Sequence, residues 1–465
     1  MKITFFGGIN EIGGNKILIE SSSTKFFIDF GLSFSKFGKY YTDFLQPRLC
    51  NGIGDLLDLE IIPDLDGIYR NDLLANEGRK TSDEPKIDGV FLSHAHSDHV
   101  GHVSLLHKDM NIFCGETCKI ILKALQESSM GGFENDYYWF RENFVKRRDK
   151  PKTERKYVTF RTGDKIKIND IEVEPIHVDH SIPGSYAFII YTPEGNIAYT
   201  GDFRSHGTKS YMTEDFIERA KEEKIDILLC EGTRVNEREK SLSEEEVYQK
   251  VKEIIRKTRN MVFVNFSFKD VDRLNTFFKA CRDGERIFAV STKLAFLIKE
   301  LQKDKHLNLP NFDEIKVYMH RSKWGIYEKE DYNTWERDFL DGDYVTAEDL
   351  KKSQEKYVLF MDFFDLKELI DIKPKAGSSY IYSSSEPHNE EQLIDFERLK
   401  NWINRFGLEM YTIHASGHAN YNEIGSLIEK IGAKKVVPIH TEHPFMFENF
   451  TKNLIIPSYS EPIEL

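Results

Sequence analysis

A histidine-rich segment, FLSHAHSDHVGH, constrains the fold of this chain more than any other feature. The apolar run KIDGVFLS at 86–93 has the length and composition of a buried β-strand. Four potential metal ligands follow it at once, namely His94, His96, Asp98 and His99. Because His94 and His96 are two residues apart, an extended backbone directs both imidazoles to the same side. Imidazole and carboxylate suit zinc or manganese, so the segment predicts a divalent-metal centre at a strand end.

The spacing of these ligands is suited to two ions. His94 and His96 would serve one ion, whereas Asp98 and His99, where the chain turns into a helix, would serve a second. Two ions roughly 3.5–4 Å apart can activate water and hold both the attacking and the leaving oxygens of an in-line displacement. That chemistry is suited to the hydrolysis of phosphodiesters.

The pattern of apolar runs differs between two parts of the chain. Short runs bounded by glycines and turns at 1–30 and 156–203 are typical of strands and hairpins, and KIDILLCEGT at 224–233 is a further strand. Residues 31–85 are interrupted by proline and glycine and are expected to be an insertion. From residue 241 onward, apolar runs alternate with amphipathic segments, which predicts a parallel sheet flanked by helices.

Composition excludes several classes of protein. No apolar run approaches the roughly 20 residues of a membrane helix, and the N-terminal segment lacks the features of a signal peptide. The five cysteines form no disulfide framework. We therefore expect a cytoplasmic protein without a membrane partner. The net charge of −13 argues against non-specific coating of nucleic acid, but it is compatible with an enzyme whose metal ions supply local positive charge.

Two further features have competing interpretations. The segment KRRDKPKTERK at 146–156 is either a solvated loop, which we favour, or a contact for a nucleic-acid backbone. Cys114 and Cys118 resemble half of a zinc site, but no second pair follows, so ordinary buried thiols are the preferred interpretation.

The HxHxDH pattern resembles that of the metallo-β-lactamase superfamily. The resemblance implies that His180 in IHVDHSIPGS completes the first ligand set, that Asp202 in YTGDF bridges both ions, and that His440 in VVPIHTEHP completes the second set. Asp29, at the end of KFFIDFG, matches the first motif of the family, an aspartate that usually buttresses the metal loops. Asn15, in the turn GGINEIGGN, is expected to brace the floor of the site.

Other histidines compete for these roles. His177 is the alternative to His180, and His443 is the alternative to His440. The HSIPGS pattern favours His180, and the position after the VVPI run favours His440. His102 and His107 follow the cluster closely and are expected on a helix surface or behind the ligands.

Three later motifs narrow the superfamily. Glu231 ends the run LLCE, the segment HASGHA contains His414 and His418, and PIHTEHP contains His440. An acid and two histidines in this order, around an α/β insertion, resemble motifs A, B and C of the β-CASP nucleases. The segments FFGGINEIGGNKILIE, HSIPGS and TPEGNIAYTGDF are similar to those of the ribonuclease J group.

The resemblance implies an α/β fold in which a metallo-β-lactamase αββα sandwich is interrupted by an inserted α/β domain. We expect residues 1–235 to form the first part of the sandwich, 236–385 the β-CASP insertion, and 386–465 the C-terminal part of the sandwich. Members of the ribonuclease J group carry an additional C-terminal domain, whereas this sequence ends shortly after His440. A homodimer is one possible assembly, and the sequence leaves the oligomeric state open.

The resemblance further implies a two-metal ribonuclease that cleaves single-stranded RNA, exo- or endonucleolytically, and leaves 5′-phosphates. Zn²⁺ is the expected ion, with Mn²⁺ as the alternative. Asp98, Glu231 and His418 would be catalytic, since a carboxylate beside an imidazole keeps it cationic. The residues expected to bind substrate are His414, Ser416, Ser384 and Ser385. A DNA nuclease is the alternative function. A small-molecule metallo-hydrolase ranks lower, because it leaves HASGHA without a role.

Overall fold

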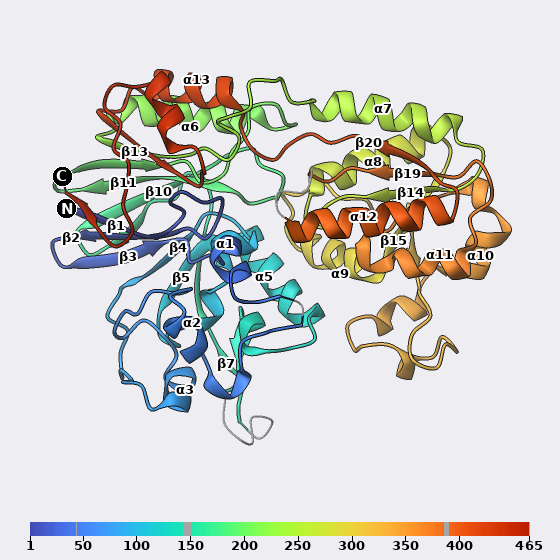
Figure 1. Cartoon of the computed structure of the whole chain (residues 1–465), viewed down its shortest axis with the longest axis horizontal. Coiled ribbons are helices and arrows are strands. Elements are labelled where there is room, and N and C mark those ends of the chain that lie inside the picture. The colour runs from blue at the N-terminus through green and yellow to red at the C-terminus, as the bar shows by residue number, and fades with distance from the viewer. Residues whose placement is uncertain (43, 143–149, 386–389, 465) are drawn as a thin grey trace. The chain divides into compact units, whose positions relative to one another are not determined.

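The computed structural model describes residues 1–42, 44–142, 150–385 and 390–464. Within them the chain forms two compact units (Figure 1). The first unit comprises Met1–Ser205, Lys209–Lys240 and Gly417–Leu465, and the second comprises His206–Thr208 and Ser241–Ser416. Part of the predicted basic loop, residues 146–149, lies outside the described residues.

The first sheet of the first unit carries the histidine-rich segment. Its strand order is β22-β1-β2-β3-β4-β5-β8. The strands are β1 (Lys2–Gly7), β2 (Lys16–Ser21), β3 (Thr24–Ile28), β4 (Gly89–Leu92), β5 (Asn111–Gly115), β8 (Lys156–Phe160) and β22 (Pro462–Glu464). β3, β4, β5 and β8 run parallel to one another, so the chain leaves β4 toward the histidines at the same edge where it leaves β3 toward Asp29.

The second sheet supplies the rest of the candidate site. Its order is β21-β13-β12-β11-β10-β9. The strands are β9 (Ile166–Ile168), β10 (Ile171–His177), β11 (Tyr186–Thr192), β12 (Gly195–Tyr199), β13 (Ile227–Glu231) and β21 (Lys435–Ile439). β11 and β12 form the predicted hairpin, with Thr192 opposite Gly195 at its turn. β12, β13 and β21 are parallel, so their carboxyl ends share one edge.

The expected hairpin-like segment at 156–178 is confirmed in part. β9 and β10 form an antiparallel hairpin, with Ile168 opposite Ile171, whereas β8 pairs with β5 in the first sheet. Alternating apolar residues identify a strand and its buried face, but they do not identify the partner strand.

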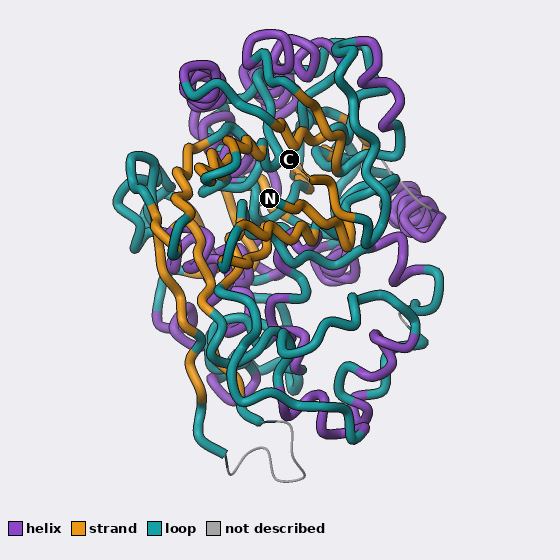
Figure 2. The backbone as a smooth tube through the Cα atoms, turned by 90° about the vertical axis from the view of Figure 1, so that its left-hand side faces the viewer, coloured by secondary structure: helices purple, strands orange, loops and turns teal. Residues whose placement is uncertain are grey.

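The two sheets pack face to face around an aromatic core. Phe91 stacks on Phe113 of its own sheet at 4.5 Å and meets Phe188 of the other sheet edge-on at 5.8 Å between ring centroids. Helix α5 (Glu116–Ser128) packs on the first sheet, and α6 (Ser210–Glu222) and α13 (Tyr421–Ile431) pack on the second. Figure 2 shows these strands in orange and the helices in purple. The predicted αββα sandwich is confirmed.

The second unit contains a parallel sheet of order β17-β16-β15-β18-β14-β19-β20. The strands are β14 (Val262–Asn265), β15 (Ile287–Ser291), β16 (Ile315–Tyr318), β17 (Tyr344–Val345), β18 (Tyr357–Phe360), β19 (Ser379–Tyr382) and β20 (Glu409–Thr412). The helices are α7 (Glu244–Lys257), α8 (Val271–Asp283), α9 (Thr292–Leu301), α10 (Ala347–Lys352), α11 (Leu369–Ile372) and α12 (Glu390–Arg405). This is the α/β insertion that the alternating runs predicted.

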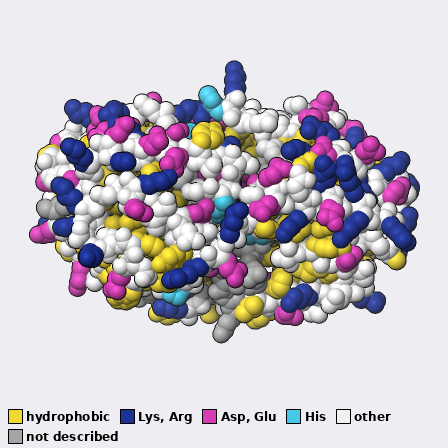
Figure 3. All heavy atoms as spheres, turned by 90° about the horizontal axis from the view of Figure 1, so that it is seen from above, with side chains coloured by type: hydrophobic (Ala, Val, Ile, Leu, Met, Phe, Trp, Pro, Cys, Tyr) yellow, Lys and Arg dark blue, Asp and Glu magenta, His cyan; other side chains and the backbone are white. Residues whose placement is uncertain are grey.

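Helix α7 shows how local sequence sets an element of this unit. Ser243 caps it in a reciprocal capping box with Glu246. The carboxyl-terminal half is basic, with Lys252, Arg256 and Lys257, which complements the helix dipole. Lys and Arg side chains accordingly gather over α7 on the right of Figure 3.

The boundary at which the chain returns to the first unit differs from the predicted one. The sequence placed it between 385 and 386, whereas the compact units divide between Ser416 and Gly417. The physical reason is the strand β20, which pairs in parallel with β19, so that Ser379 lies opposite Glu409. The pairing partner of β20 cannot be deduced from its own residues.

The expected insertion at 31–85 consists of loops and short helices in its described part. These helices are α1 (Phe34–Gly38), α2 (Gly54–Asp58) and α3 (Asn71–Leu74). The helix α4 (Ser97–Val100) follows the histidine-rich segment, and β6 (Trp139–Phe140) pairs with β7 (Thr153–Glu154). Among the described residues, no helix is long and apolar enough to cross a membrane.

Candidate metal centre

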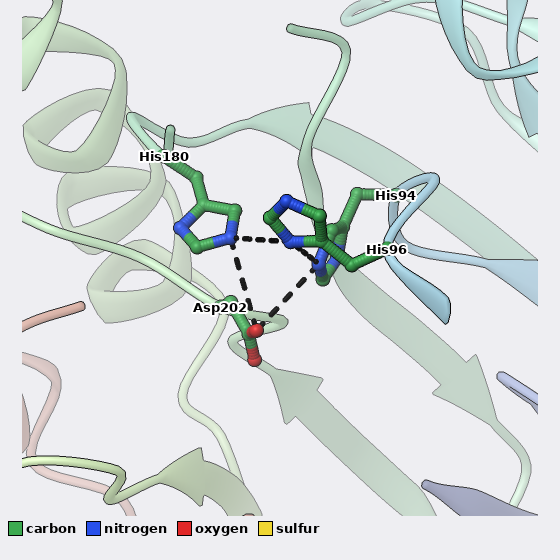
Figure 4. Close-up of side chains that lie close together, drawn as sticks. All are labelled: His94, His96, His180 and Asp202. Carbon is green, nitrogen blue, oxygen red and sulfur yellow. Dashed lines mark hydrogen bonds and ion pairs between the residues drawn. The ribbon is translucent and has the colours of Figure 1, made fainter. Parts of the chain in front are cut away.

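Three imidazoles and one carboxylate converge in the first unit (Figure 4). His94 and His96 follow β4, His180 follows β10, and Asp202 follows β12. Nδ1 of His96 lies 3.1 Å from Nε2 of His94 and 3.1 Å from Nε2 of His180. Oδ2 of Asp202 lies 3.5 Å from Nε2 of His94 and 3.8 Å from Nε2 of His180. The sequence predicted these four residues as one ligand set, and the structure brings them together.

The charge states of this set suit a cation. Burial and the neighbouring imidazoles lower the pKa of His94 well below its usual value. Burial, followed by the charge of His418, lowers the pKa of His180 to about 3. Nδ1 of His180 donates to the carbonyl of Gly417 at 2.5 Å, which leaves Nε2 with a lone pair directed at the centre. Neutral imidazole nitrogens facing one another and a carboxylate form a donor set that a divalent ion can satisfy.

A second set shares Asp202 with the first and contains Asp98, His99 and His440. Nε2 of His99 lies 3.1 Å from Oδ2 of Asp202, and Nε2 of His440 lies 3.0 Å from Oδ2 of Asp98. Although burial opposes it, the carboxylates of Asp202 and Asp98 raise the pKa of His440 to about 9. The set therefore favours positive charge. Oδ1 of Asp202 is buried without a hydrogen-bond partner in the described part of the chain, as expected of an atom reserved for a ligand.

Asp29 buttresses this set, in the role that the sequence predicted. Its Oδ2 accepts hydrogen bonds from Nδ1 of His99 at 2.7 Å, Oγ of Ser93 at 2.8 Å and the hydroxyl of Tyr199 at 2.5 Å. The side-chain Nδ2 of Asn15 donates to the hydroxyl oxygen of Tyr199 at 3.1 Å. A carboxylate on one imidazole nitrogen fixes the tautomer and directs the other nitrogen at the centre. Tyr199 is the first residue of the YTGDF motif, but that motif predicted a role for Asp202 alone, so the contribution of Tyr199 was not predicted.

The backbone of the histidine-rich loop is clamped by two neighbouring segments. The amide of Asn15 donates to the carbonyl of Asp98 at 3.1 Å, and the amide of Phe30 donates to that of His99 at 2.8 Å. A Cβ at Gly31 would lie 1.6 Å from the Asp98 carbonyl oxygen. Only glycine permits this approach, so Gly31 is required for the position of the loop.

Glu231 and His418 form an ion pair beside Asp202. Oε1 of Glu231 lies 3.2 Å from Nδ1 of His418, and Oδ2 of Asp202 lies 3.9 Å from the same nitrogen. Although burial opposes it, the two carboxylates raise the pKa of His418. The backbone amide of Thr233 donates to Oε2 of Glu231 at 2.9 Å and thereby fixes the carboxylate. Asp202, Glu231 and His418 are close enough to one another to form a third candidate metal-binding set.

The four predicted substrate-binding residues all belong to the second unit. Nδ1 of His414 lies 3.0 Å from the carbonyl oxygen of Ser383, and Oγ of Ser384 donates to Asn265 at 2.8 Å. The carbonyl of Ser385 accepts from Tyr382, and the carbonyl of Ser416 accepts from Nε2 of His206 at 2.9 Å. They follow β19 and β20, which are adjacent parallel strands.

A buried arginine, which sequence reasoning missed, holds these loops. Arg273 on α8 pairs with Glu244 at 2.7 Å and donates to the carbonyl of Ser383 at 2.8 Å and to that of Ala415 at 3.1 Å. Its Nη1 also lies 3.3 Å from Nδ1 of His414. An arginine within an amphipathic helix carries no sequence signal for such a role.

The rival histidines and the cysteine pair lie outside the metal sets. His177 contacts Thr162 and stacks on Tyr186, and His443 contacts Asn236. His102 and His107 are buried, so they are not on a helix surface. Cys114 and Cys118 are buried free thiols, and no metal-type cluster of described residues includes them.

The comparison with protein families matches two parts of the chain. Residues 63–261 match the model described as a beta-lactamase superfamily domain. Residues 405–448 match the model described as a Zn-dependent metallo-hydrolase RNA specificity domain. Together with the donor sets, these matches identify a divalent-metal centre.

Several curated relatives are similar over nearly the whole chain. Ribonuclease J of Mycoplasma pneumoniae is 23% identical over 96% of this chain and 68% of its own length. Ribonuclease J of Helicobacter pylori strain 26695 is 24% identical, with 95% of this chain and 56% of the relative covered. Ribonuclease J of Pyrococcus abyssi is 24% identical, with 95% and 90% covered.

A solved structure supports the fold. A protein of unknown function from Enterococcus faecalis V583 superposes with a TM-score of 0.76 and 24% identity, covering 100% of this chain and 99% of that one. At this identity the likeness establishes the architecture alone.

Proposed function

Because the chain belongs to the metallo-β-lactamase superfamily, in its ribonuclease J-like β-CASP branch, we propose that it is a two-metal ribonuclease acting on single-stranded RNA. One observation carries the proposal. A single carboxylate, that of Asp202, belongs to both four-residue donor sets and also lies beside the Glu231–His418 pair. The names of the relatives and of the RNA specificity domain supply the class of substrate.

The ligand assignment follows the two donor sets. His94, His96, His180 and Asp202 would hold one ion, and Asp98, His99, Asp202 and His440 would hold the other. We propose Zn²⁺ for both positions, because imidazole with carboxylate suits it, with Mn²⁺ as the alternative. When bound, the ions supply Lewis acidity to a phosphoryl group and a nucleophile derived from water at neutral pH.

His418 is proposed as the general acid. Glu231 accepts a hydrogen bond from its Nδ1 and stabilises the imidazolium form. A cationic imidazole beside the donor sets can stabilise charge on the phosphoryl group and donate a proton to the departing 3′ oxygen, which leaves a 5′-phosphate on the other product. In a hydrolase of small molecules, the Glu231–His418 pair would have no comparable role.

The second unit is proposed to bind phosphate groups of the substrate. His414, Ser416, Ser384 and Ser385 follow the carboxyl ends of adjacent parallel strands, where ligands bind in open α/β sheets. Arg273 supports this proposal, since it fixes the carbonyls of Ser383 and Ala415 and therefore the loops.

A cleavage assay tests the function. Labelled single-stranded RNA and DNA of the same sequence are incubated with the zinc- or manganese-loaded protein, and the product ends are identified. We expect RNA cleavage that leaves 5′-phosphates and that is abolished in Asp98→Ala and His418→Ala. Equal cleavage of DNA would contradict the RNA assignment, and turnover of thioesters or lactams without polymer cleavage would contradict a nuclease. Comparison of 5′-phosphate with 5′-hydroxyl RNA separates exonucleolytic from internal cutting.

A further inference from the structure

A long connection in the second unit, between β16 and β17, presents a tryptophan to solvent. The connection is drawn in gold at the lower right of Figure 1. The side chain of Trp324 is 83% exposed, and that of Ile326 is 59% exposed. The chain has four tryptophans, and the other three, Trp139, Trp335 and Trp402, are half-buried. The indole of Trp324 therefore keeps apolar surface in contact with water after the chain has folded.

The backbone beneath this indole is firmly built. The buried carboxylate of Asp331 accepts hydrogen bonds from the amides of Trp324 at 3.2 Å and Ile326 at 2.8 Å. The amide of Gly325 donates to the carbonyl of Ser322 at 2.8 Å. Gly325 has a φ of 71°, which glycine adopts without strain. The turn therefore fixes the backbone that carries the ring.

Two basic residues, Arg321 and Lys323, lie close to Trp324 in the sequence. Arg321 and Lys323 are both exposed, and no carboxylate pairs with either of them in the described part of the chain. The guanidinium of Arg321 lies against Gly325, where a Cβ would be 3.0 Å from its Nε. Nζ of Lys323 donates to the carbonyl of Glu330, which leaves its charge uncompensated.

Acidic residues of the same loop limit the charged surface. Asp341 pairs with Lys329, and Asp338 pairs with Lys299, so these carboxylates are neutralised. Glu330 follows Trp324 later in the loop, and as an acidic residue it opposes the positive charge of Arg321 and Lys323. A contact with a polyanion must therefore be local to Arg321, Lys323 and Trp324.

We propose that Trp324, together with Arg321 and Lys323, is a stacking site for a base of single-stranded RNA. A rigid aromatic face binds any base by stacking, and two unpaired cations beside it can contact the adjacent phosphates. A protein partner would require a wider apolar patch than one ring and Ile326 between charges. The inference rests on the proposed function, because its ligand is the substrate of that function.

Phe364 in the same unit is a natural comparison. Its side chain is 81% exposed, so it presents a similarly open aromatic face. Its neighbours in the sequence include Asp362, which would repel a phosphate backbone. Exposure alone therefore predicts equal roles for the two rings, whereas exposure combined with charge assigns RNA binding to Trp324.

The test measures binding of a labelled single-stranded oligoadenylate to the full-length chain carrying Asp98→Ala, which prevents cleavage. Adding Trp324→Ala should weaken binding by roughly 5- to 150-fold, the equivalent of one lost base stack. Trp324→Phe should restore most of the affinity, and Phe364→Ala should leave it unchanged. An abasic oligomer should bind the Asp98→Ala parent and its Trp324→Ala derivative equally. The intrinsic fluorescence of Trp324 should be quenched by oligoadenylate.

A second measurement isolates the cations. Replacing Arg321 and Lys323 by glutamine should reduce the slope of log affinity against log salt concentration by about 1.4, because each lost contact with a single strand accounts for about 0.7. Thermal unfolding of every variant should match that of the parent, since the replaced side chains are exposed.

The failures are distinguishable. If the wild type cleaves RNA but Trp324→Ala binds it as tightly as the parent, the stacking site is wrong and the proposed function stands. If the chain neither binds nor cleaves RNA, both are wrong. If Trp324→Ala instead lowers the sedimentation mass, the ring belongs to a contact between copies of the chain, which also overturns the stacking site.

Discussion

Two short segments of this chain each contain a pair of histidines, and the structure uses them in opposite ways. In the segment around residue 95, His94 and His96 meet, with their facing nitrogens 3.1 Å apart. In the segment around residue 416, His414 belongs to the second compact unit, whereas His418 belongs to the first. His94 and His96 therefore contribute to a single cluster, whereas His414 and His418 are divided between the two compact units.

The charge states of the two segments differ as well. Burial and neighbouring imidazoles keep His94 neutral, as a donor to a cation requires. The carboxylates of Glu231 and Asp202 raise the pKa of His418 despite its burial, so this imidazole favours the cationic form. We propose His94 as a ligand and His418 as an acid, and their different neighbours account for the opposite directions of their pKa shifts.

The largest effect is expected from Asp202→Ala. Its carboxylate is common to all three candidate sets, so its loss should remove bound metal and reduce RNA cleavage by about 10³-fold or more. Steady-state cleavage and metal analysis by mass spectrometry check this together. Asp202→Asn, which keeps the volume but not the charge, should behave similarly. Full metal content with full activity in either variant would contradict the shared-carboxylate account.

Glu231→Gln should impair the proposed general acid, His418, without impairing the proposed metal ligands. We expect roughly a 10²-fold lower kcat with metal content unchanged, because the imidazolium of His418 loses its counter-charge. A group that acts while protonated is active below its pKa and loses activity as pH rises through it. Since Glu231 raises the pKa of His418, the alkaline limb of the pH profile should move to lower pH in this variant.

The control for that change is Glu237→Gln, because Glu237 is an exposed acid of the same unit paired with Arg234. Its profile should match that of the wild type. Metal loss in Glu231→Gln, or an alkaline limb that stays in place, would count against His418 as the acid.

A smaller effect is expected from Tyr199→Phe. This change removes one of the hydrogen bonds to Asp29, which orients His99, and should weaken metal binding by about tenfold. Competition with a chelator measures the affinity directly. Tyr191→Phe also removes a hydrogen bond to a carboxylate, that of Glu174, but at a place unconnected to the ligands, and should leave affinity unchanged. Equal affinity in the two variants would exclude Tyr199 as a positioning residue.

The sequence predicted those parts of the molecule that depend on local order. The histidine-rich segment marked four of the seven predicted ligands, and the family resemblance supplied His180, Asp202 and His440, each of which follows a strand marked by its own apolar run. The Glu231–His418 pair was predicted by motif resemblance and is adjacent in the structure. Their roles as ligands and catalyst stay predictions, as do the homodimer and the cytoplasmic location.

The parts that were missed depend on partners distant in the sequence. Tyr199 and Arg273 act through hydrogen bonds to residues far away along the chain. Tyr199 begins the YTGDF motif, but the motif does not reveal its partner, and Arg273 lies in no recognised motif. The boundary after Ser416 and the partner of β8 depend on which strand lies alongside, which alternation does not encode.

The most direct test of the account is anomalous diffraction at the zinc edge from crystals of the zinc-loaded protein. The account predicts one peak among His94, His96, His180 and Asp202, and a second among Asp98, His99, Asp202 and His440. It predicts no peak among Asp202, Glu231 and His418, although these residues are also close enough to bind an ion. A zinc peak at Glu231 and His418 would make His418 a ligand and would contradict the division of labour between the two histidine segments.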